Sequence, residues 1–277
     1  MLQLIAKNRE GFQIPSNAHQ MHFPAGEAHI SQIKDLDEVP VAAFIQGASA
    51  EDLVMLAMAA DYANQVGDGL KALMPYLLGA RADRGTPFGA AVYANLINSM
   101  HLKEVICFDP HSPVITNMIH RLTVLDTVDV IKRTVLNGSI DYVGIISPDH
   151  GSRDRSSRIA KAINLPMIRA GKDRDPETGK LSNFRCEEIP NPDGRYLVVD
   201  DICDGGGTFL GLAEVIGLPK ENLDLWVSHG VFSKGAERLK SAYGNVFTTN
   251  SHPGHANPDV NAQVIDLLPF LLEIANK

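Results

Sequence analysis

Short, continuously apolar segments alternate with segments of helical period along most of the chain. Such segments favour strands buried on both faces, because a strand with one wet face alternates apolar and polar residues. Strands that alternate with helices of about 10–15 residues are typical of parallel sheets. The sequence therefore predicts an α/β fold with mostly parallel sheets flanked by helices. We expect strands over residues 39–46, 70–78, 104–109, 142–147, 195–201, 223–229 and 246–249, and helices over residues 90–100, 155–163, 208–216 and 264–276, with a further helix that begins at the capping residue Ser49.

The length of the chain allows one large domain or two modest ones, since it has 277 residues and domains commonly have about 100–200. A weak boundary falls near residues 125–138, where one run of strands and helices ends and another begins. We therefore predict an N-terminal domain over residues 1–130 and a C-terminal domain over residues 131–277.

Charge and cysteine content exclude several classes of protein. The net charge of −8 argues against a general nucleic-acid-binding protein. The cysteines at positions 107, 186 and 203 lack CxxC spacing, which argues against a disulfide framework and a structural zinc site. No apolar run approaches the roughly 18–20 residues of a membrane helix, and the first residues lack the apolar region of a signal peptide. We expect a cytoplasmic protein with no nucleic-acid or membrane partner.

The most informative local sequence is YLVVDDICDGGGTF at residues 196–209. An apolar strand ends in two carboxylates, Asp200 and Asp201, and a glycine-rich loop then leads into a helix that begins near Thr208. Glycines let backbone N–H groups converge, and the helix N-terminus adds the positive end of its dipole, so this loop suits a phosphate. The carboxylates can accept hydrogen bonds from sugar hydroxyls. An ordinary β–α turn explains the glycines but not the adjacent acids, and the Walker pattern is absent. The segment therefore predicts a site for a sugar phosphate.

Residues 170–193 have no helical or strand period and are rich in charge, glycine and proline. A loop of this length in a compact domain is usually functional or disordered. Taken alone, its Lys172 and Arg174 are most simply solvated loop charges.

Residues 198–208 resemble the phosphoribosyl-diphosphate motif of type I phosphoribosyltransferases. Other segments resemble, in the same order along the chain, motifs of the ribose-phosphate diphosphokinase (PRPP synthetase) family. The resemblance runs from about Phe23 to the end of the sequence and implies two tandem phosphoribosyltransferase-like domains with the active site between them. The matching segments are GARADR at 79–84 for the family's YARQD, FDPH at 108–111 for DLH, SPDHG at 147–151 for SPDxG, SHGVFS at 228–233 for THGxFS, and VID at 264–266.

The resemblance implies transfer of the β,γ-diphosphate of ATP to the C1 hydroxyl of ribose 5-phosphate, with Mg2+ as cofactor and AMP as the second product. Lys172 and Arg174 fit the Lys-x-Arg of the family's mobile catalytic loop, which would stabilise charge on the transferring group. His111 and Asp149 match the positions that serve Mg2+. Because this ion prefers oxygen ligands, Asp149 and the ATP phosphates should supply most of them.

The remaining binding residues are carried over position by position from the same resemblance. ATP would contact Phe23, Glu27, Arg81 and His111. The ribose hydroxyls would bind Asp200 and Asp201, and the 5-phosphate would bind Asp204, Gly205, Gly206, Gly207 and Thr208. The family also implies a homo-oligomer, either a dimer or a hexamer.

Two positions depart from the family pattern: Ala82 replaces a glutamine and Ala25 replaces an asparagine. Both lie in segments expected to contact the nucleotide. Two alternatives share part of the pattern, namely a phosphoribosyltransferase that consumes phosphoribosyl diphosphate and a non-catalytic regulatory paralogue. Other polar residues have simpler interpretations. Arg153, Arg155 and Arg158 are most simply a solvated helix face, although the site could recruit one of them. His150, His229, His252 and His255 are structural or surface groups.

Overall fold

The computed structural model describes residues 2–7, 13–15, 18–31, 40–47, 49–137, 140–175, 178 and 181–277, and only the backbone of residues 7, 13–15 and 174. The chain divides into two compact units. The N-terminal unit comprises Met1–Leu125 and Leu267–Lys277, and the C-terminal unit comprises Asp126–Asp266. No helix of the described residues is both long and apolar enough to cross a membrane.

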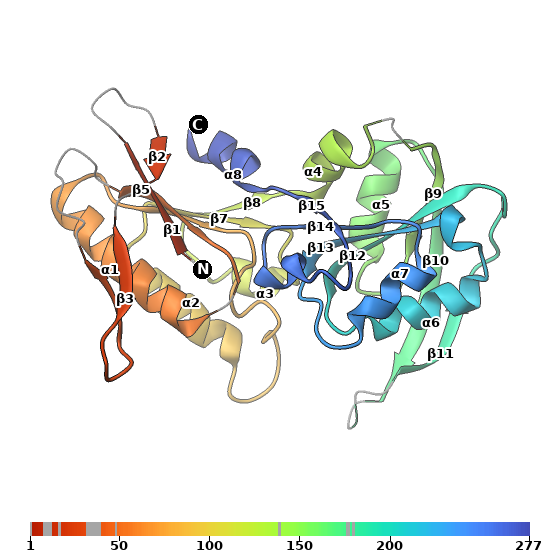
Figure 1. Ribbon diagram of the computed structural model, residues 1–277, viewed down its shortest axis with the longest axis horizontal. Coiled ribbons are helices and arrows are strands. Elements are labelled where there is room, and N and C mark those ends of the chain that lie inside the picture. The colour runs from red at the N-terminus through yellow and green to blue at the C-terminus, as the bar shows by residue number, and fades with distance from the viewer. Residues whose placement is uncertain are drawn as a thin grey trace. The chain divides into compact units, whose positions relative to one another are not determined.

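Parallel strands form the centre of the N-terminal unit (Figure 1). Its strands are β1 (Leu2–Lys7), β2 (Gln13–Pro15), β3 (His19–His22), β4 (Ala28–Ser31), β5 (Pro40–Ile45), β6 (Lys71–Met74), β7 (Glu104–Phe108) and β8 (Leu122–Leu125). Among the described residues, they form a six-stranded sheet in the order β2-β1-β5-β6-β7-β8 and the separate hairpin β3–β4. The strands from β5 to β8 are parallel, whereas β1 and β2 add antiparallel strands that the sequence did not predict. The predicted strand over 70–78 is shorter, because Pro75 offers no N–H to a neighbouring strand.

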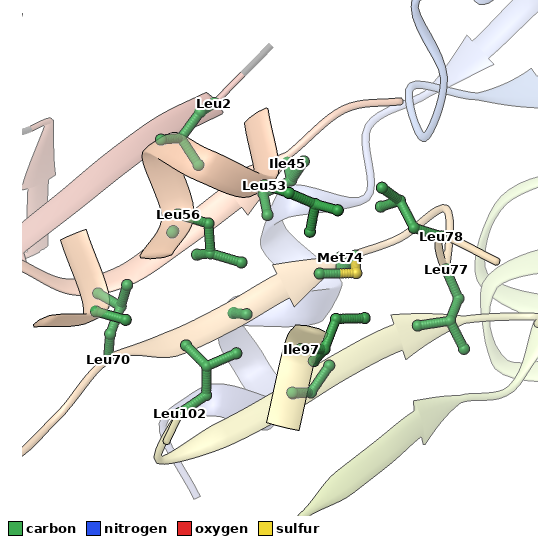
Figure 2. Packing of buried hydrophobic residues seen from close by; sticks show 14 of the residues in the cluster. Leu2, Ile45, Leu53, Leu56, Leu70, Met74, Leu77, Leu78, Ile97 and Leu102 are labelled. Carbon is green, nitrogen blue, oxygen red and sulfur yellow. The ribbon is translucent and has the colours of Figure 1, made fainter. Parts of the chain in front are cut away.

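Helices cover both faces of this sheet. They are α1 (Ala50–Val66), α2 (Gly89–Ser99), the short α3 (Pro113–Thr116) and α8 (Leu268–Ala275). Ser49 caps α1 as predicted, since its hydroxyl accepts hydrogen bonds from the backbone N–H groups of Glu51 and Asp52 at 3.1 and 3.3 Å. Figure 2 shows the resulting core, in which leucines of α1 meet Met74 of β6 and Ile97 of α2. This packing buries the apolar stripes that predicted both helices.

The predicted helix over residues 264–276 is wrong in its first turn. Residues Gln263–Ile265 instead form a strand, β15, and α8 begins only at Leu268, where Pro269 fits the first helical turn. α8 packs on β7 and β8, and the Nζ of Lys71 donates a hydrogen bond to the carbonyl oxygen of Ala275 at 2.6 Å. These contacts explain why residues 267–277 belong to the N-terminal unit, whereas the predicted second domain ran to residue 277.

The C-terminal unit also has a parallel sheet between helices (Figure 1). Among its described residues, a seven-stranded sheet has the order β11-β10-β9-β12-β13-β14-β15. All neighbours are parallel except β10 and β11. The strands are β9 (Tyr142–Ser147), β10 (Met167–Arg174), β11 (Leu181–Cys186), β12 (Arg195–Cys203), β13 (Leu223–Gly230), β14 (Val246–Thr249) and β15. The helices are α4 (Thr127–Thr134), α5 (Arg153–Ala162), α6 (Gly207–Ile216) and α7 (Leu239–Ala242), with short 3-10 turns at Lys220–Asn222, Ala236–Arg238 and Pro253–Ala256.

Candidate active site

The connections of the C-terminal sheet reverse beside β9. The chain runs from β9 to β10 on one side, and after β11 it crosses to β12 on the other side of β9. In open α/β sheets, ligands bind outside the carboxyl ends of the strands at such a reversal. Asp149 follows β9, while Asp200 and Asp201 lie near the end of β12. The fold therefore brings these three predicted site residues to the same edge of the sheet.

Asp149 lies in a turn that fixes its carboxylate. Its Oδ1 accepts a hydrogen bond from the backbone N–H of Ser152 at 3.1 Å, and its Oδ2 accepts one from the Nζ of Lys172 at 2.5 Å. Burial acts to raise the pKa of Asp149, but the hydrogen bond and charge of Lys172, with the backbone N–H groups of Ser152 and Gly151, outweigh burial and lower the pKa. Asp149 is therefore an ionised carboxylate that can offer oxygen ligands to a metal ion, and Lys172 balances its charge.

The segment expected to be an irregular loop over residues 170–193 instead contributes residues 170–174 to β10 and residues 181–186 to β11, which corrects the prediction for these residues. Lys172 belongs to β10, which pairs with the antiparallel β11. The side chain of Lys172 is only 8% exposed, so it is not a solvated charge. The side chain of Arg174, also at the end of β10, lies outside the described residues. The hairpin shows no apolar period because its outward faces carry charged residues such as Asp173 and Arg185, which form a salt bridge at 3.1 Å.

Two adjacent buried carboxylates face one buried guanidinium. Asp200 and Asp201 are 9% and 7% exposed, and Arg155 of α5 is 8% exposed. The Nη1 of Arg155 lies 3.8 Å from Oδ1 of Asp200, and its Nη2 lies 3.9 Å from Oδ2 of Asp201. Burial and the neighbouring charges of Asp201 and Asp149 raise the pKa of Asp200, and the charge of Arg155 opposes them. The arrangement offers carboxylate oxygens to hydroxyl donors at the edge of the sheet.

The glycine-rich loop joins β12 to α6 as predicted. Gly206, the residue before α6, has a φ of 77°, which is a left-handed conformation that glycine adopts without strain. The segment after β13 supports the loop, since the backbone N–H of Ser233 donates to the carbonyl oxygen of Asp204 at 3.2 Å. Residues 205–208 thus stand at the N-terminus of a ten-residue helix, where backbone N–H groups and the helix dipole favour an anion.

The predicted adenine-contacting residues lie in the N-terminal unit, at the tip of the β3–β4 hairpin. The backbone N–H of Phe23 donates to the carbonyl oxygen of Glu27 at 2.9 Å, and Gly26 makes the turn with a φ of 100°. Phe23 is 45% exposed, and its ring packs at a tilt against His29 with a centroid separation of 5.2 Å. The hairpin thus presents an aromatic ring and a carboxylate to the outside, which fits contact with a base.

Two further predicted segments meet at the carboxyl ends of β6 and β7. His111 and Arg81 are exposed there, and Asp83, in the same segment as Arg81, lies near Ser112 and His111 of the other segment. Burial acts to raise the pKa of Asp83, but side-chain contacts with Ser112 and Arg84 and the charges of Arg84 and His111 lower it overall. The structure therefore brings residues 79–84 together with residues 108–111, as a shared site requires.

Asp149 and His111 have the donor chemistry of the predicted Mg2+ ligands only in part. Asp149 supplies an ionised carboxylate, which suits this ion, whereas the imidazole of His111 suits it less. Among the residues that the structure describes, no group of three or more His, Cys, Asp or Glu side chains is arranged to hold a metal. The residues fit an ion that takes most of its ligands from substrate phosphates and water.

Sequence reasoning did not assign Asp83 to these sites, and it left Arg155 only as one of three arginines that the site could recruit. Arg155 carried the expectation of a solvated helix face, which is wrong, because its side chain is 9% exposed. Its neighbours on the same helix do fit that expectation, since Arg153 is exposed and the side chain of Arg158 is 41% exposed. The available signal was spacing, because Arg155 lies in the first turn of the helix that follows Asp149.

No family model matches the chain, but curated proteins are similar to it in sequence. The curated ribose-phosphate pyrophosphokinase of Pyrococcus abyssi is 25% identical over 270 residues, which cover 94% of this chain and 91% of that protein. The corresponding protein of Thermococcus kodakarensis is 25% identical over 258 residues, covering 91% and 89%. That of Cereibacter sphaeroides is 32% identical over 196 residues, covering 66% and 57%.

The fold is also similar to a solved structure. The crystal structure of phosphoribosylpyrophosphate synthetase from Mycobacterium smegmatis matches with a TM-score of 0.78 at 18% identity, covering 94% of this chain and 89% of that one. This match concerns the fold, and the curated relatives extend the similarity to the sequence over nearly the full length. The chain is therefore similar to ribose-phosphate pyrophosphokinases over nearly its full length and has the α/β fold of phosphoribosylpyrophosphate synthetase.

Proposed function

We propose that this protein is a ribose-phosphate diphosphokinase, which transfers the β,γ-diphosphate of ATP to the C1 hydroxyl of ribose 5-phosphate. The products are phosphoribosyl diphosphate and AMP. The observation that carries the proposal is a set of groups at one edge of the C-terminal sheet. It comprises the buried carboxylates of β12, the glycine-rich N-terminus of α6, and the ion pair between Lys172 of β10 and Asp149, which follows β9. The similarity to ribose-phosphate pyrophosphokinases suggests the reaction, and this set of groups suits it.

The sugar phosphate would bind along the β12–α6 segment. Asp200 and Asp201 accept hydrogen bonds from ribose hydroxyls, and charge-assisted bonds of this kind are the stronger ones. Asp204 and residues 205–208 surround the 5-phosphate, which the backbone N–H groups and the helix dipole stabilise. The sugar is then held at two points, which orients its C1 hydroxyl for attack on the β-phosphorus.

Cationic groups would stabilise the transferring diphosphate. Lys172 contributes a point charge and Arg174 a planar guanidinium, both suited to phosphate oxygens. Asp149 and His111 would hold Mg2+, which, when bound, neutralises phosphate charge. Because Asp149 balances the charge of Lys172, a ligand that engages Asp149 leaves Lys172 to the diphosphate.

The nucleotide would be held by Phe23, Glu27, Arg81 and His111. The exposed ring of Phe23 at the hairpin tip supports stacking on adenine. Such a projecting contact suits a site on a neighbouring subunit, so the proposal includes a homo-oligomer, a dimer or a hexamer, that works in the cytoplasm. Ala25 and Ala82 remove two polar groups from this contact surface.

One assay tests the proposal. The purified protein with Mg2+ and ATP should release AMP only when ribose 5-phosphate is added, and phosphorus NMR should detect phosphoribosyl diphosphate in equal amount. Asp200→Asn and Asp201→Asn should weaken ribose 5-phosphate binding in calorimetric titrations and leave ATP binding largely intact. Absence of AMP release would favour the regulatory paralogue, and consumption of phosphoribosyl diphosphate with a nucleobase would favour a phosphoribosyltransferase.

A further inference from the structure

We infer that Arg155 is a positioning residue for the sugar site, which holds the carboxylates of Asp200 and Asp201 in place by bridging them with its guanidinium group. The inference rests on the proposed function, because it assigns those carboxylates to the sugar. Arg155 does not contact the reacting atoms in this assignment; it acts through the two aspartates.

The geometry of the bridge differs from that of an ordinary buried ion pair. One guanidinium nitrogen faces each carboxylate, at 3.8 Å for Asp200 and 3.9 Å for Asp201. These separations exceed hydrogen-bond distance, so the guanidinium acts on the two carboxylates through its charge. Elsewhere in the same unit, Arg195 donates two hydrogen bonds of 2.9 Å to the single carboxylate of Asp224. Arg195 engages both oxygens of its partner, whereas Arg155 divides its charge between two neighbouring acids.

The local charges explain why the site needs this cation. Two adjacent carboxylates in a buried setting repel each other, and one of them tends to take up a proton unless a counter-ion is present. Asp149 adds a third negative charge, which acts on Asp200, but Lys172 lies against Asp149 at 2.5 Å. Arg155 is the cation that the structure places against Asp200 and Asp201 themselves.

The backbone makes this placement possible. Asp149 lies two residues after the end of β9, and α5 begins four residues after Asp149, at Arg153. Arg155 lies in the first turn of α5, so the helix that follows one site residue directs its buried side chain toward the end of β12. Arg153, two residues earlier in the same turn, is exposed. It therefore provides a matched control with the same change in charge.

Calorimetric titration of three variants tests the inference. Arg155→Met should raise the dissociation constant for ribose 5-phosphate at least about tenfold, the effect of losing one charge-assisted interaction, and change that for ATP by less than about twofold on the same scale. Arg155→Lys should recover part of the loss, because it restores the positive charge but not the planar guanidinium that faces both carboxylates. Arg153→Met should bind both ligands like the wild type. Unchanged ribose 5-phosphate affinity in a folded Arg155→Met protein, or an equal loss for ATP, would overturn the inference.

A stability cycle gives a readout that needs no substrate. Urea unfolding is measured for Arg155→Met, Asp201→Asn and the double variant. The double variant should lose less unfolding free energy than the sum of the single variants. The reason is that Asp201→Asn removes one of the two negative charges that Arg155 neutralises, so the loss of Arg155 costs less. Additive losses would contradict the bridge. If Arg155→Met does not fold, Arg155→Lys replaces it in both experiments. A wild-type protein that binds no ribose 5-phosphate would refute the proposed function, while this cycle would still decide whether the bridge exists.

Discussion

Buried carboxylates occur in two different settings in the C-terminal unit. Asp224 is fully buried and accepts hydrogen bonds from the hydroxyl of Tyr142 at 2.6 Å and from two nitrogens of Arg195 at 2.9 Å. Burial and this hydrogen bond raise the pKa of Tyr142. The Asp200 and Asp201 carboxylates instead lie beside a more distant guanidinium. Short and complete contacts indicate a structural role for Asp224, and the other pair stands where a ligand is expected.

Asp224→Ala should lower the unfolding free energy by about 3 kcal/mol, because it removes the fully buried carboxylate that pairs with the partly buried Arg195. Urea unfolding followed by circular dichroism measures the loss. The exposed Asp193→Ala is the control and should change stability by less than about 0.5 kcal/mol. Equal stabilities would mean that the Asp224 network contributes little.

Lys172→Ala should reduce turnover at least about a hundredfold, because a cation that acts on a transferring phosphoryl group has an effect of this size or larger on the rate. Either Michaelis constant should change by only a few-fold. Contacts that strengthen in the transition state affect kcat more than substrate binding. Steady-state kinetics of AMP release measure both constants, with Lys161→Ala, an exposed residue of α5, as control. Near-wild-type turnover would show that Lys172 only balances Asp149.

The strands that the sequence predicted well are those buried on both faces. Residues 142–147 and 246–249 form strands with the predicted bounds, because no exposed face interrupts their apolar runs. The missed strands β1, β3 and β4 are antiparallel, and β10–β11 carries charge on its outer faces. The position of the glycine-rich loop was predictable because its chemistry is local. The burial of Arg155 was not predictable from local sequence, because it depends on β12, which begins forty residues later in the chain.

The loop before α6 depends on one backbone conformation. Gly206→Ala should lower stability by about 1–2 kcal/mol, the usual effect of a left-handed conformation on a residue with a side chain. The added Cβ would also lie 3.2 Å from the side chain of Leu239. Thermal unfolding measures the change, and Gly207→Ala is the control, because its Cβ would meet only Leu181 at 3.8 Å. A larger loss for Gly207→Ala would contradict this account.

The N-terminal unit is built from two separate stretches of chain. Leu267 and Leu271 are fully buried, and Lys71 bonds to Ala275 at 2.6 Å. Truncation after Asp266 should therefore destabilise this unit while the C-terminal unit keeps its own core. Hydrogen exchange should show faster exchange in β7 and β8, which contact α8, and unchanged exchange in β12 and β13. Equal acceleration in both units would contradict the division of the chain.

The return of the chain to its first unit also has a consequence for the order of events during protein synthesis. Residues 126–266, which form the C-terminal unit, are all translated before α8. Domains generally fold as units as they leave the ribosome. The N-terminal unit is therefore begun first and completed last. The face of its sheet that α8 covers stays uncovered while the C-terminal unit folds.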